Sequence, residues 1–233
     1  PSKAGDMLTM PAPSFGNRPI TLLALFQDRL VVGAGNVLRL SAQGDYLNFY
    51  RPSLLTSVQS GASEDLYAAG TTGDVIRKAA LYDRNLTLYG DSYHYVMPGR
   101  QAFDPSNPQL SVQYAIEGTG RSQPVSAGDK VFVMKEDTSL AAVQVLQMNP
   151  GVWQDSPQVD TISKQLRSYL NGTPAEMVSI TSPSILFVRT EFINRSDGAY
   201  PLGRPFGLYT YNYMDTPEGR AHESWSAWEW SAA

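Results

Sequence analysis

The 233-residue sequence contains no cysteine and only two histidines, His94 and His222. The absence of cysteine excludes disulfide bonds, thiolate zinc sites and a cysteine nucleophile. The two histidines are far apart in the sequence, and neither has a partner at the spacing of a metal-binding pair. No GxSxG element accompanies them, so a serine triad is not indicated. We therefore expect no catalytic residue, no metal and no cofactor.

Strong charge and long apolar runs are also missing. Only 17% of the residues are charged and the formal net charge is -4, so no basic surface is expected to hold nucleic acid tightly. No apolar run approaches the roughly 20 residues that cross a bilayer, which predicts no membrane-spanning segment. The first residues, "PSKAGDML", have neither the basic nor the apolar region of a signal peptide and no methionine. This beginning favours an excised domain or a processed product.

Strand and turn residues dominate what is present. Nineteen Gly, 16 Pro and 13 Tyr favour short strands and turns over long helices. Four segments resemble one another, each with a short apolar stretch, a polar turn, a β-rich run and an alternating strand: approximately 20–50, 75–100, 123–149 and 177–214. The copies recur about every 45 to 55 residues, the spacing of four-stranded propeller blades. We predict a mainly β, propeller-like array of about four antiparallel blades in a single domain, 1–233.

Two local patterns refine this prediction. In "GLYTYNYM" the side chains of Tyr209, Tyr211 and Tyr213 share one face of a strand, and packing against an adjacent sheet is favoured over a binding platform. In "VDTISKQLRSYLNGTP" Ile162, Leu166, Tyr169 and Leu170 form an apolar stripe at helical spacing. That stripe predicts one short helical insertion at approximately 160–171.

The stretch "LVVGAGNVLRL", residues 30–40, resembles a dinucleotide-binding loop. Such a loop needs a third small residue and a following helix whose N-terminus receives the pyrophosphate. Here Leu38 occupies the third position, and "NVLRL" alternates like a second strand. We therefore predict a hairpin in which Gly33 to Asn36 form a tight turn without a ligand, with Gly33 and Gly35 in backbone conformations that other residues avoid.

Carboxylates and tryptophans leave a second class of function open. Glycoside hydrolysis needs two carboxylates at a set separation, and Glu64, Asp65, Asp155 and Glu191 are candidates. The segment "HESWSAWEW" places Trp225, Trp228 and Trp230 close together. These rings are expected to be buried within the chain or at an interface, and an exposed cluster would instead bind sugar or another subunit.

Taken in order, the motifs resemble a known family. The sequence reads "PSFGNRPITLLALFQDRLVVGAGNVLRLSAQGDYLNF", then "ALYDRNLTLYGDSYHYVM", then "GLYTYNYMDTPEGRAHESWSAWEW". This order is similar to the central region of tail tubular protein B, the tail nozzle protein of short-tailed bacteriophages (podoviruses). The positions that match are Pro13, Ser14, Phe15, Arg29, Leu30, Gly44, Asp45, Phe49, Ser224, Trp225 and Trp228.

The resemblance implies a structural role in the virion. It implies a ring of copies, a hexamer, stacked under the tail adaptor protein (tail tubular protein A) and in reach of tail fibres. Viral DNA would pass through the lumen without specific binding, and the tail would assemble in the bacterial host cytoplasm. Members of the family are several times longer than this chain, which would then be a fragment or a compact relative.

Two other functions remain open at this point. The first is a carbohydrate-binding or carbohydrate-hydrolysing β-protein that acts on bacterial surface polysaccharide. The second is a scaffold propeller in a cellular complex.

Overall fold

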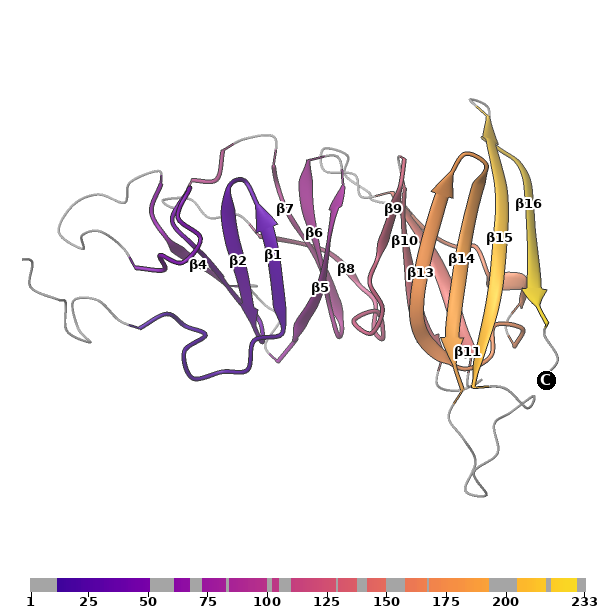
Figure 1. Cartoon of the computed structure of the whole chain (residues 1–233), viewed down its shortest axis with the longest axis horizontal. Coiled ribbons are helices and arrows are strands. Elements are labelled where there is room, and N and C mark those ends of the chain that lie inside the picture. Colours follow the sequence, from indigo (N-terminus) through magenta and orange to yellow (C-terminus); the bar gives the residue numbers. More distant parts are fainter. Residues whose placement is uncertain are drawn as a thin grey trace, which may run out of the picture. The chain divides into compact units, whose positions relative to one another are not determined.

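The computed structural model describes residues 12–50, 61–67, 73–82, 84–99, 102–104, 110–128, 130–137, 142–149, 158–166, 168–192, 205–216 and 219–229. Within these ranges, sixteen strands form four antiparallel sheets of four strands each, shown as arrows in Figure 1. The predicted mainly β, blade-like fold is thereby confirmed. The chain divides into two compact units, residues 1–117 and 118–233. That all 233 residues act as one domain stays a prediction.

The first unit holds two sheets with strands in chain order. Sheet 1 consists of β1 (Leu22–Phe26), β2 (Arg29–Ala34), β3 (Val37–Leu40) and β4 (Glu64–Tyr67). Sheet 2 consists of β5 (Ile76–Tyr82), β6 (Asn85–Gly90), β7 (Tyr93–Met97) and β8 (Ser111–Ala115). Alternate residues of both sheets bury one continuous core that includes Val31, Leu40, Leu88 and Tyr95.

The second unit repeats this arrangement. Sheet 3 consists of β9 (Val125–Ala127), β10 (Lys130–Asp137), β11 (Ala142–Asn149) and β12 (Gln158–Thr161). Sheet 4 consists of β13 (Thr173–Thr181), β14 (Ser184–Glu191), β15 (Phe206–Thr216) and β16 (Gly219–Trp228). The two sheets share a core in which Tyr209, Tyr211 and Tyr213 are buried. The packing interpretation of these three tyrosines is therefore confirmed.

Each predicted repeat corresponds to one sheet. The predicted polar turns are two-residue hairpin connections between the first two strands, closed by Phe26 and Arg29, Tyr82 and Asn85, Ala127 and Lys130, and Thr181 and Ser184. The fourth strand of every sheet lies outside the predicted repeat. Long connections precede β4, β8 and β12 and separate these strands in the sequence from the other three strands of their sheets.

The turn predicted at Gly33 to Asn36 is shorter than expected. Gly33 lies within β2, opposite Leu22 and Leu38, and the connection consists of Gly35 and Asn36 alone. Gly35 has a φ of 70°, within the positive-φ region that two-residue hairpin turns take at their first central residue. The expectation that Gly33 supplies such a conformation is wrong. A side chain there would meet the Cβ of Leu22 at 2.9 Å, so this glycine serves close strand packing.

The helix predicted at approximately 160–171 is reduced to one 3-10 turn. Residues 158–161 form β12, and the helical part is Lys164–Leu166. Asp160 pairs with Gln147 of β11 rather than capping a helix, and Leu170 packs into the core. Pairing with an open strand edge satisfied the backbone groups that a helix would otherwise have satisfied, so tertiary context overrode the apolar periodicity.

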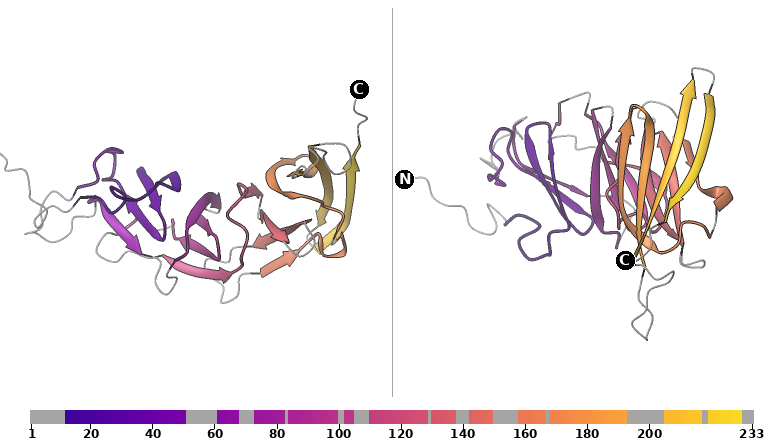
Figure 2. Two further views of the ribbon diagram at one scale, coloured as in Figure 1. Left: turned by 90° about the horizontal axis from the view of Figure 1, so that it is seen from below. Right: turned by 45° about the vertical axis from the view of Figure 1, so that its right-hand side comes forward.

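The distal part of the β15–β16 hairpin extends past its neighbouring strand. Pairing between β14 and β15 reaches Asn212, whereas β15 and β16 remain paired as far as Thr216 and Gly219. Two views of the molecule show this yellow hairpin projecting beyond β14 (Figures 1 and 2). The projecting end carries the charged residues considered next. Across the described residues, none of the helices is long and apolar enough to span a membrane.

Candidate functional site

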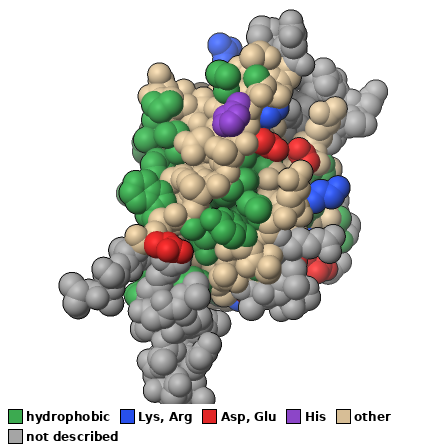
Figure 3. All heavy atoms as spheres, turned by 90° about the vertical axis from the view of Figure 1, so that its right-hand side faces the viewer, with side chains coloured by type: hydrophobic (Ala, Val, Ile, Leu, Met, Phe, Trp, Pro, Cys, Tyr) green, Lys and Arg blue, Asp and Glu red, His purple; other side chains and the backbone are tan. Residues whose placement is uncertain are grey.

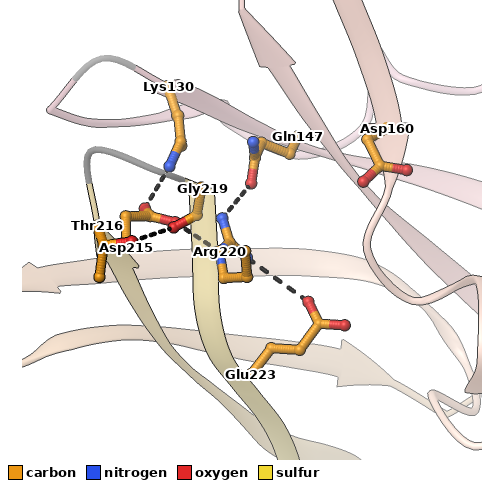
Figure 4. Close-up of a pocket in the computed structure, with 8 residues that line it drawn as sticks. All are labelled: Lys130, Gln147, Asp160, Asp215, Thr216, Gly219, Arg220 and Glu223. Atoms are coloured by element: carbon orange, nitrogen blue, oxygen red, sulfur yellow. Dashed lines mark hydrogen bonds and ion pairs between the residues drawn. The ribbon is translucent and has the colours of Figure 1, made fainter.

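A polar pocket of about 350 Å³ lies between the projecting hairpin and sheet 3 (Figure 4). Strands β10, β11 and β12 supply one side of it, and the end of the β15–β16 hairpin supplies the other. The lining residues are Lys130, Gln147, Asp160, Asp215, Thr216, Gly219, Arg220 and Glu223. Antiparallel pairing of β15 and β16 brings Asp215 opposite Arg220, so the hairpin itself juxtaposes the two charges.

Arg220 is the centre of the contacts in this pocket. Its Nε donates to Oδ1 of Asp215 at 2.6 Å, and its Nη2 donates to Oε1 of Gln147 on β11 at 2.8 Å. Its Nη1 donates to the hydroxyl of Tyr211, which in turn donates to Oε2 of Glu223 at 2.8 Å. The guanidinium carbon lies 4.9 Å from the ring centroid of Tyr213. One side chain thus joins the hairpin tip to sheet 3 by hydrogen bonds and a cation–π contact.

Lys130 attaches the same carboxylate to β10. Its ammonium group donates to Oδ2 of Asp215, while Arg220 occupies Oδ1. Both oxygens of Asp215 therefore accept charge-assisted hydrogen bonds, one from each sheet. In Figure 4 the side chains of Lys130 and Arg220 converge on Asp215, while Asp160 lies apart at the other side of the pocket.

The ionisation of these groups suits a structural link. Burial acts to raise the pKa of Asp215, but the hydrogen bonds from Lys130 and Arg220 outweigh it and leave that pKa below its ordinary value. Burial, together with the hydrogen bond to Glu223, raises the pKa of Tyr211. These shifts favour an ionised Asp215 and a neutral Tyr211. The cluster therefore holds fixed charges that pair with one another.

A second polar cluster lies in the first unit and is centred on Arg29, a residue of the family pattern. Arg29 is 1% exposed, and its Nη1 donates to the carbonyl oxygens of Ser41 and Ala62 at 2.7 Å each. Its guanidinium carbon also lies 5.1 Å from the ring centroid of Phe103. This arginine therefore connects three segments that follow or separate the strands of the unit. It supports the backbone of these segments.

The motif "PSF", residues 13–15, packs on the face of sheet 1 that carries Asp65. Ser14 donates to Oδ1 of Asp65 at 2.8 Å, and the same carboxylate forms a salt bridge with Arg39 at 3.2 Å. The rings of Phe15 and Phe49 meet edge to face at 5.0 Å between centroids. The motif residues Phe15 and Phe49, 34 positions apart in the sequence, are thus direct neighbours. These contacts attach residues 13–15 to sheet 1 and to the 42–50 loop.

Two of the carboxylates considered for glycoside hydrolysis, Glu64 and Asp65, do not face each other. Glu64 and Asp65 are adjacent on β4, so their side chains point to opposite faces of sheet 1. Glu191 lies in the other unit and accepts a hydrogen bond from Arg189 at 3.2 Å. Asp155 lies outside the described residues. The adjacent pair Glu64 and Asp65 therefore does not act as the two facing carboxylates of a glycoside hydrolase.

The histidines and tryptophans are also placed. His94 is buried in β7 between the rings of Tyr89 and Tyr114, and burial lowers its pKa to about 4. His222 is exposed on β16. Among the described residues, no group of three His, Asp or Glu side chains could hold a metal ion. Trp225 packs against the core of the second unit, Trp228 is 53% exposed, and Trp230 lies outside the described residues.

Sequence reasoning missed the cluster around Arg220. Its members come from β10, β11, β15 and β16, so the partners on sheet 3 are distant in sequence from those on the hairpin. The available signal was the alternation of charge in "DTPEGRAHE", which places Asp215 and Arg220 on either side of a turn. The partners Lys130 and Gln147 had no detectable signal, because strand pairing across sheets is not encoded locally.

Comparison with known proteins agrees with the resemblance seen in the sequence. A family model described as "Bacteriophage nozzle protein" matches residues 2–233. Tail tubular protein gp12 of Escherichia phage T7 is 19% identical over 229 residues, which are 98% of this chain and 27% of that protein. This chain therefore spans about a quarter of the length of that curated relative.

A solved structure gives a weaker similarity. One chain of a Saccharomyces cerevisiae complex of Dbp5 with Nup159 and Gle1 aligns over 89% of this chain and 47% of its own length, with 11% identity and a TM-score of 0.49. The family match, by contrast, covers nearly every residue. The chain belongs to the bacteriophage nozzle protein family.

Proposed function

We propose that the chain forms a rigid β-rich segment of a nozzle subunit in the tail of a short-tailed bacteriophage. The observation that carries the proposal is the family match over residues 2–233. The four sheets support it, because antiparallel sheets that bury shared cores resist deformation while their loops meet neighbouring proteins. The charged pocket adds a link between sheets 3 and 4 rather than a reactive centre, so the proposed role is structural and not catalytic.

We further propose that copies of the subunit assemble into a ring, a hexamer, below the tail adaptor protein and in reach of the tail fibres. Identical subunits that contact one another head to tail close into rings when the rotation permits. Assembly would take place in the host cytoplasm before the tail joins the capsid. The ring would surround a lumen through which the genome leaves the particle.

The charge of the chain suits such a channel. Phosphate contacts give strong, salt-dependent attachment to DNA, which would slow the passage of a genome. With a formal net charge of -4, this chain has no excess of basic residues to provide such contacts. We expect the isolated chain to bind duplex DNA too weakly for a salt-dependent isotherm to be measured by fluorescence anisotropy at physiological ionic strength.

Electron microscopy of the intact particle tests the proposal. Particles labelled with an antibody raised against this chain should carry the label on a ring at the tail, below the portal. Particles that contain no copy of this chain, or particles that carry the label on the capsid alone, would contradict the structural role. Release of sugar from host polysaccharide by the chain, abolished by replacing a single Asp or Glu, would instead favour the carbohydrate function.

A further inference from the structure

The end of the β15–β16 hairpin is paired with the rest of sheet 4 only at its base. Among the described residues, the pairing of β15 with β14 stops at Asn212, and from Tyr213 onward β15 pairs with β16 alone. We call residues 213–216 and 219–223 the hairpin end. A two-stranded hairpin is marginally stable in water unless its side chains pack against other elements. The contacts of the hairpin end with sheet 3 therefore decide whether it stays in place.

A β-bulge in β16 determines where Arg220 points. Met214 lies opposite His222, but the next pair is Asp215 and Arg220, so Ala221 is an extra residue on β16. An extra residue interrupts the alternation of side chains along a strand. Arg220 consequently takes the side of the hairpin that Ala221 would otherwise take. The bulge thus turns Arg220 toward Asp215 and toward sheet 3.

Within the described part of the chain, the hairpin end meets sheet 3 through polar and aromatic contacts. These are the hydrogen bond from Arg220 to Gln147 at 2.8 Å, the ion pair of Lys130 with Asp215, and the packing of Tyr213 against Phe132 at 5.7 Å between ring centroids. In Figure 3, basic, acidic and histidine side chains lie close together in the upper part of the surface, at the height at which the hairpin projects in Figure 1. Charge therefore contributes to holding the hairpin end, whereas an apolar core joins the remainder of sheets 3 and 4.

The charges at this contact alternate in sign. The carboxylate of Asp215 lies between the ammonium group of Lys130 and the guanidinium group of Arg220. The side chains of Lys130 and Arg220 are only 11% and 20% exposed, so salt screens them less than it screens a free surface pair. While Asp215 is ionised, it holds the two cations together. Once Asp215 is neutral, the two cations face each other and the contact becomes repulsive.

Other titratable groups surround this contact without taking the place of Asp215. They are Tyr211, Tyr213, His222 and Glu223 of the hairpin, Lys130 of β10 and Asp160 of β12. Glu223 lies 3.6 Å from Arg220, but both residues belong to β16 and move together. Asp160 lies apart at the other side of the pocket (Figure 4). Asp215 is therefore the carboxylate whose charge links the hairpin end to sheet 3.

We propose that the hairpin end is a charge-controlled latch, which rests on sheet 3 while Asp215 is ionised and separates from sheet 3 as a local unit when that charge is removed. Both cores stay folded, and separation uncovers the ring of Tyr213, which is 9% exposed in the closed arrangement. Although burial acts to raise the pKa of Asp215, the hydrogen bonds from Lys130 and Arg220 leave it below its ordinary value. The closed arrangement therefore loses stability as the pH falls below about 4. This inference is independent of the proposed role in a phage tail.

Spin labels test the latch, because the chain has no cysteine of its own. Met214→Cys places one label on the hairpin end, where the native side chain is 56% exposed, and Gln158→Cys places the other at an exposed position of β12. Pulsed electron–electron double resonance measures the distance between the labels at neutral pH. We expect Asp215→Asn to increase the population at the longer distance at least about tenfold. The matched control is Glu176→Gln, which removes the carboxylate of an exposed salt bridge with Arg189 in the same sheet and should leave the distances unchanged.

A pH titration provides a second measurement that leaves the latch intact. In the doubly labelled chain that retains Asp215, lowering the pH from neutral to about 3 should increase the same population, whereas the Asp215→Asn variant should respond little. Circular dichroism at each pH follows the folding of the sheets. Unchanged distances in Asp215→Asn would overturn the proposal. So would an equal response to pH in both proteins, which would assign the movement to another carboxylate, or a loss of β-sheet signal together with the distance change, because the hairpin end would then not move as a local unit.

Discussion

At the scale of single residues, Arg29 shows how a buried charge organises the first unit. Its guanidinium is almost fully enclosed and donates to two backbone carbonyl groups from the segments after β3 and before β4. Burial lowers its pKa, although Asp28 opposes that shift. A buried charge is tolerated only where hydrogen bonds replace its hydration.

We predict that Arg29→Met lowers the free energy of unfolding by about 2–4 kcal/mol, because two buried carbonyl oxygens lose their donor. Urea denaturation followed by tyrosine fluorescence and far-ultraviolet circular dichroism measures the change, because all four tryptophans lie outside the first unit. The control is Arg77→Met: Arg77 forms an exposed salt bridge with Asp91 at 2.7 Å, and we expect this variant to lose less than about 1 kcal/mol. Equal losses in the two variants would show that burial of Arg29 is not the cause.

His94 makes the stability of the first unit depend on pH. Burial holds its pKa at about 4 in the folded chain, below the ordinary 6.5. The unfolded chain therefore binds the proton first as the pH falls, and the free energy of unfolding should decrease between about pH 6.5 and pH 4. In the His94→Gln variant this part of the pH dependence should disappear. Denaturation curves at half-unit pH steps provide the measurement, and an unchanged slope in the variant would refute the assignment to His94.

At the scale of elements, short hairpins fix the register of the sheets. Four two-residue connections join the first two strands of the four sheets, and a fifth joins β2 to β3. Because side chains alternate along a strand, a slip of one residue would exchange the buried and exposed faces. The connections therefore decide which face enters the core.

We predict that substitutions at Gly35 and at Gly33 destabilise the fold for different reasons. At Gly35, with φ at 70° and no atom within 4 Å of an added Cβ, Gly35→Val should cost about 1–2 kcal/mol through backbone conformation, and Gly35→Asn should cost clearly less. At Gly33 both replacements should be destabilising, because the added Cβ meets Leu22. Thermal unfolding of the four variants separates the cases. Equal effects of Val and Asn at Gly35 would contradict the conformational explanation.

At the scale of the whole molecule, two compact units each have their own core. Leu88 belongs to the first core and Leu186 to the second, and both are fully buried. Truncating such a side chain leaves a cavity and costs about 2–5 kcal/mol. Whether such a substitution destabilises one unit or both depends on whether the two units unfold independently.

We predict that Leu88→Ala lowers the amide hydrogen-exchange protection of strands β1 to β8 and leaves β9 to β16 unchanged, and that Leu186→Ala does the reverse. Exchange measured by mass spectrometry on both variants and the wild type checks this. Equal loss of protection in both halves would instead favour the single domain over 1–233 that the sequence analysis predicts. The control is Val178→Thr, a substitution at an exposed position that leaves both cores intact.

The sequence by itself determined the fold class, the four repeats and the turns between their first strands. These features depend on local rules: alternation in "GLYTYNYM", turn residues such as Gly35, and the near-regular spacing of similar segments. The order of the motifs was also sufficient to indicate the family, because that order can be compared between proteins without knowledge of their structures.

Only the tertiary structure decided the rest. The apolar stripe from Ile162 to Leu170 was compatible with a helix, and the edge of β11 captured Asp160 and its neighbours as a strand instead. Gly33 packs against Leu22, and Lys130 reaches Asp215 across 85 positions of sequence. These contacts join segments that carry no local record of one another, so the free energy that selects them exists only once the sheets are packed.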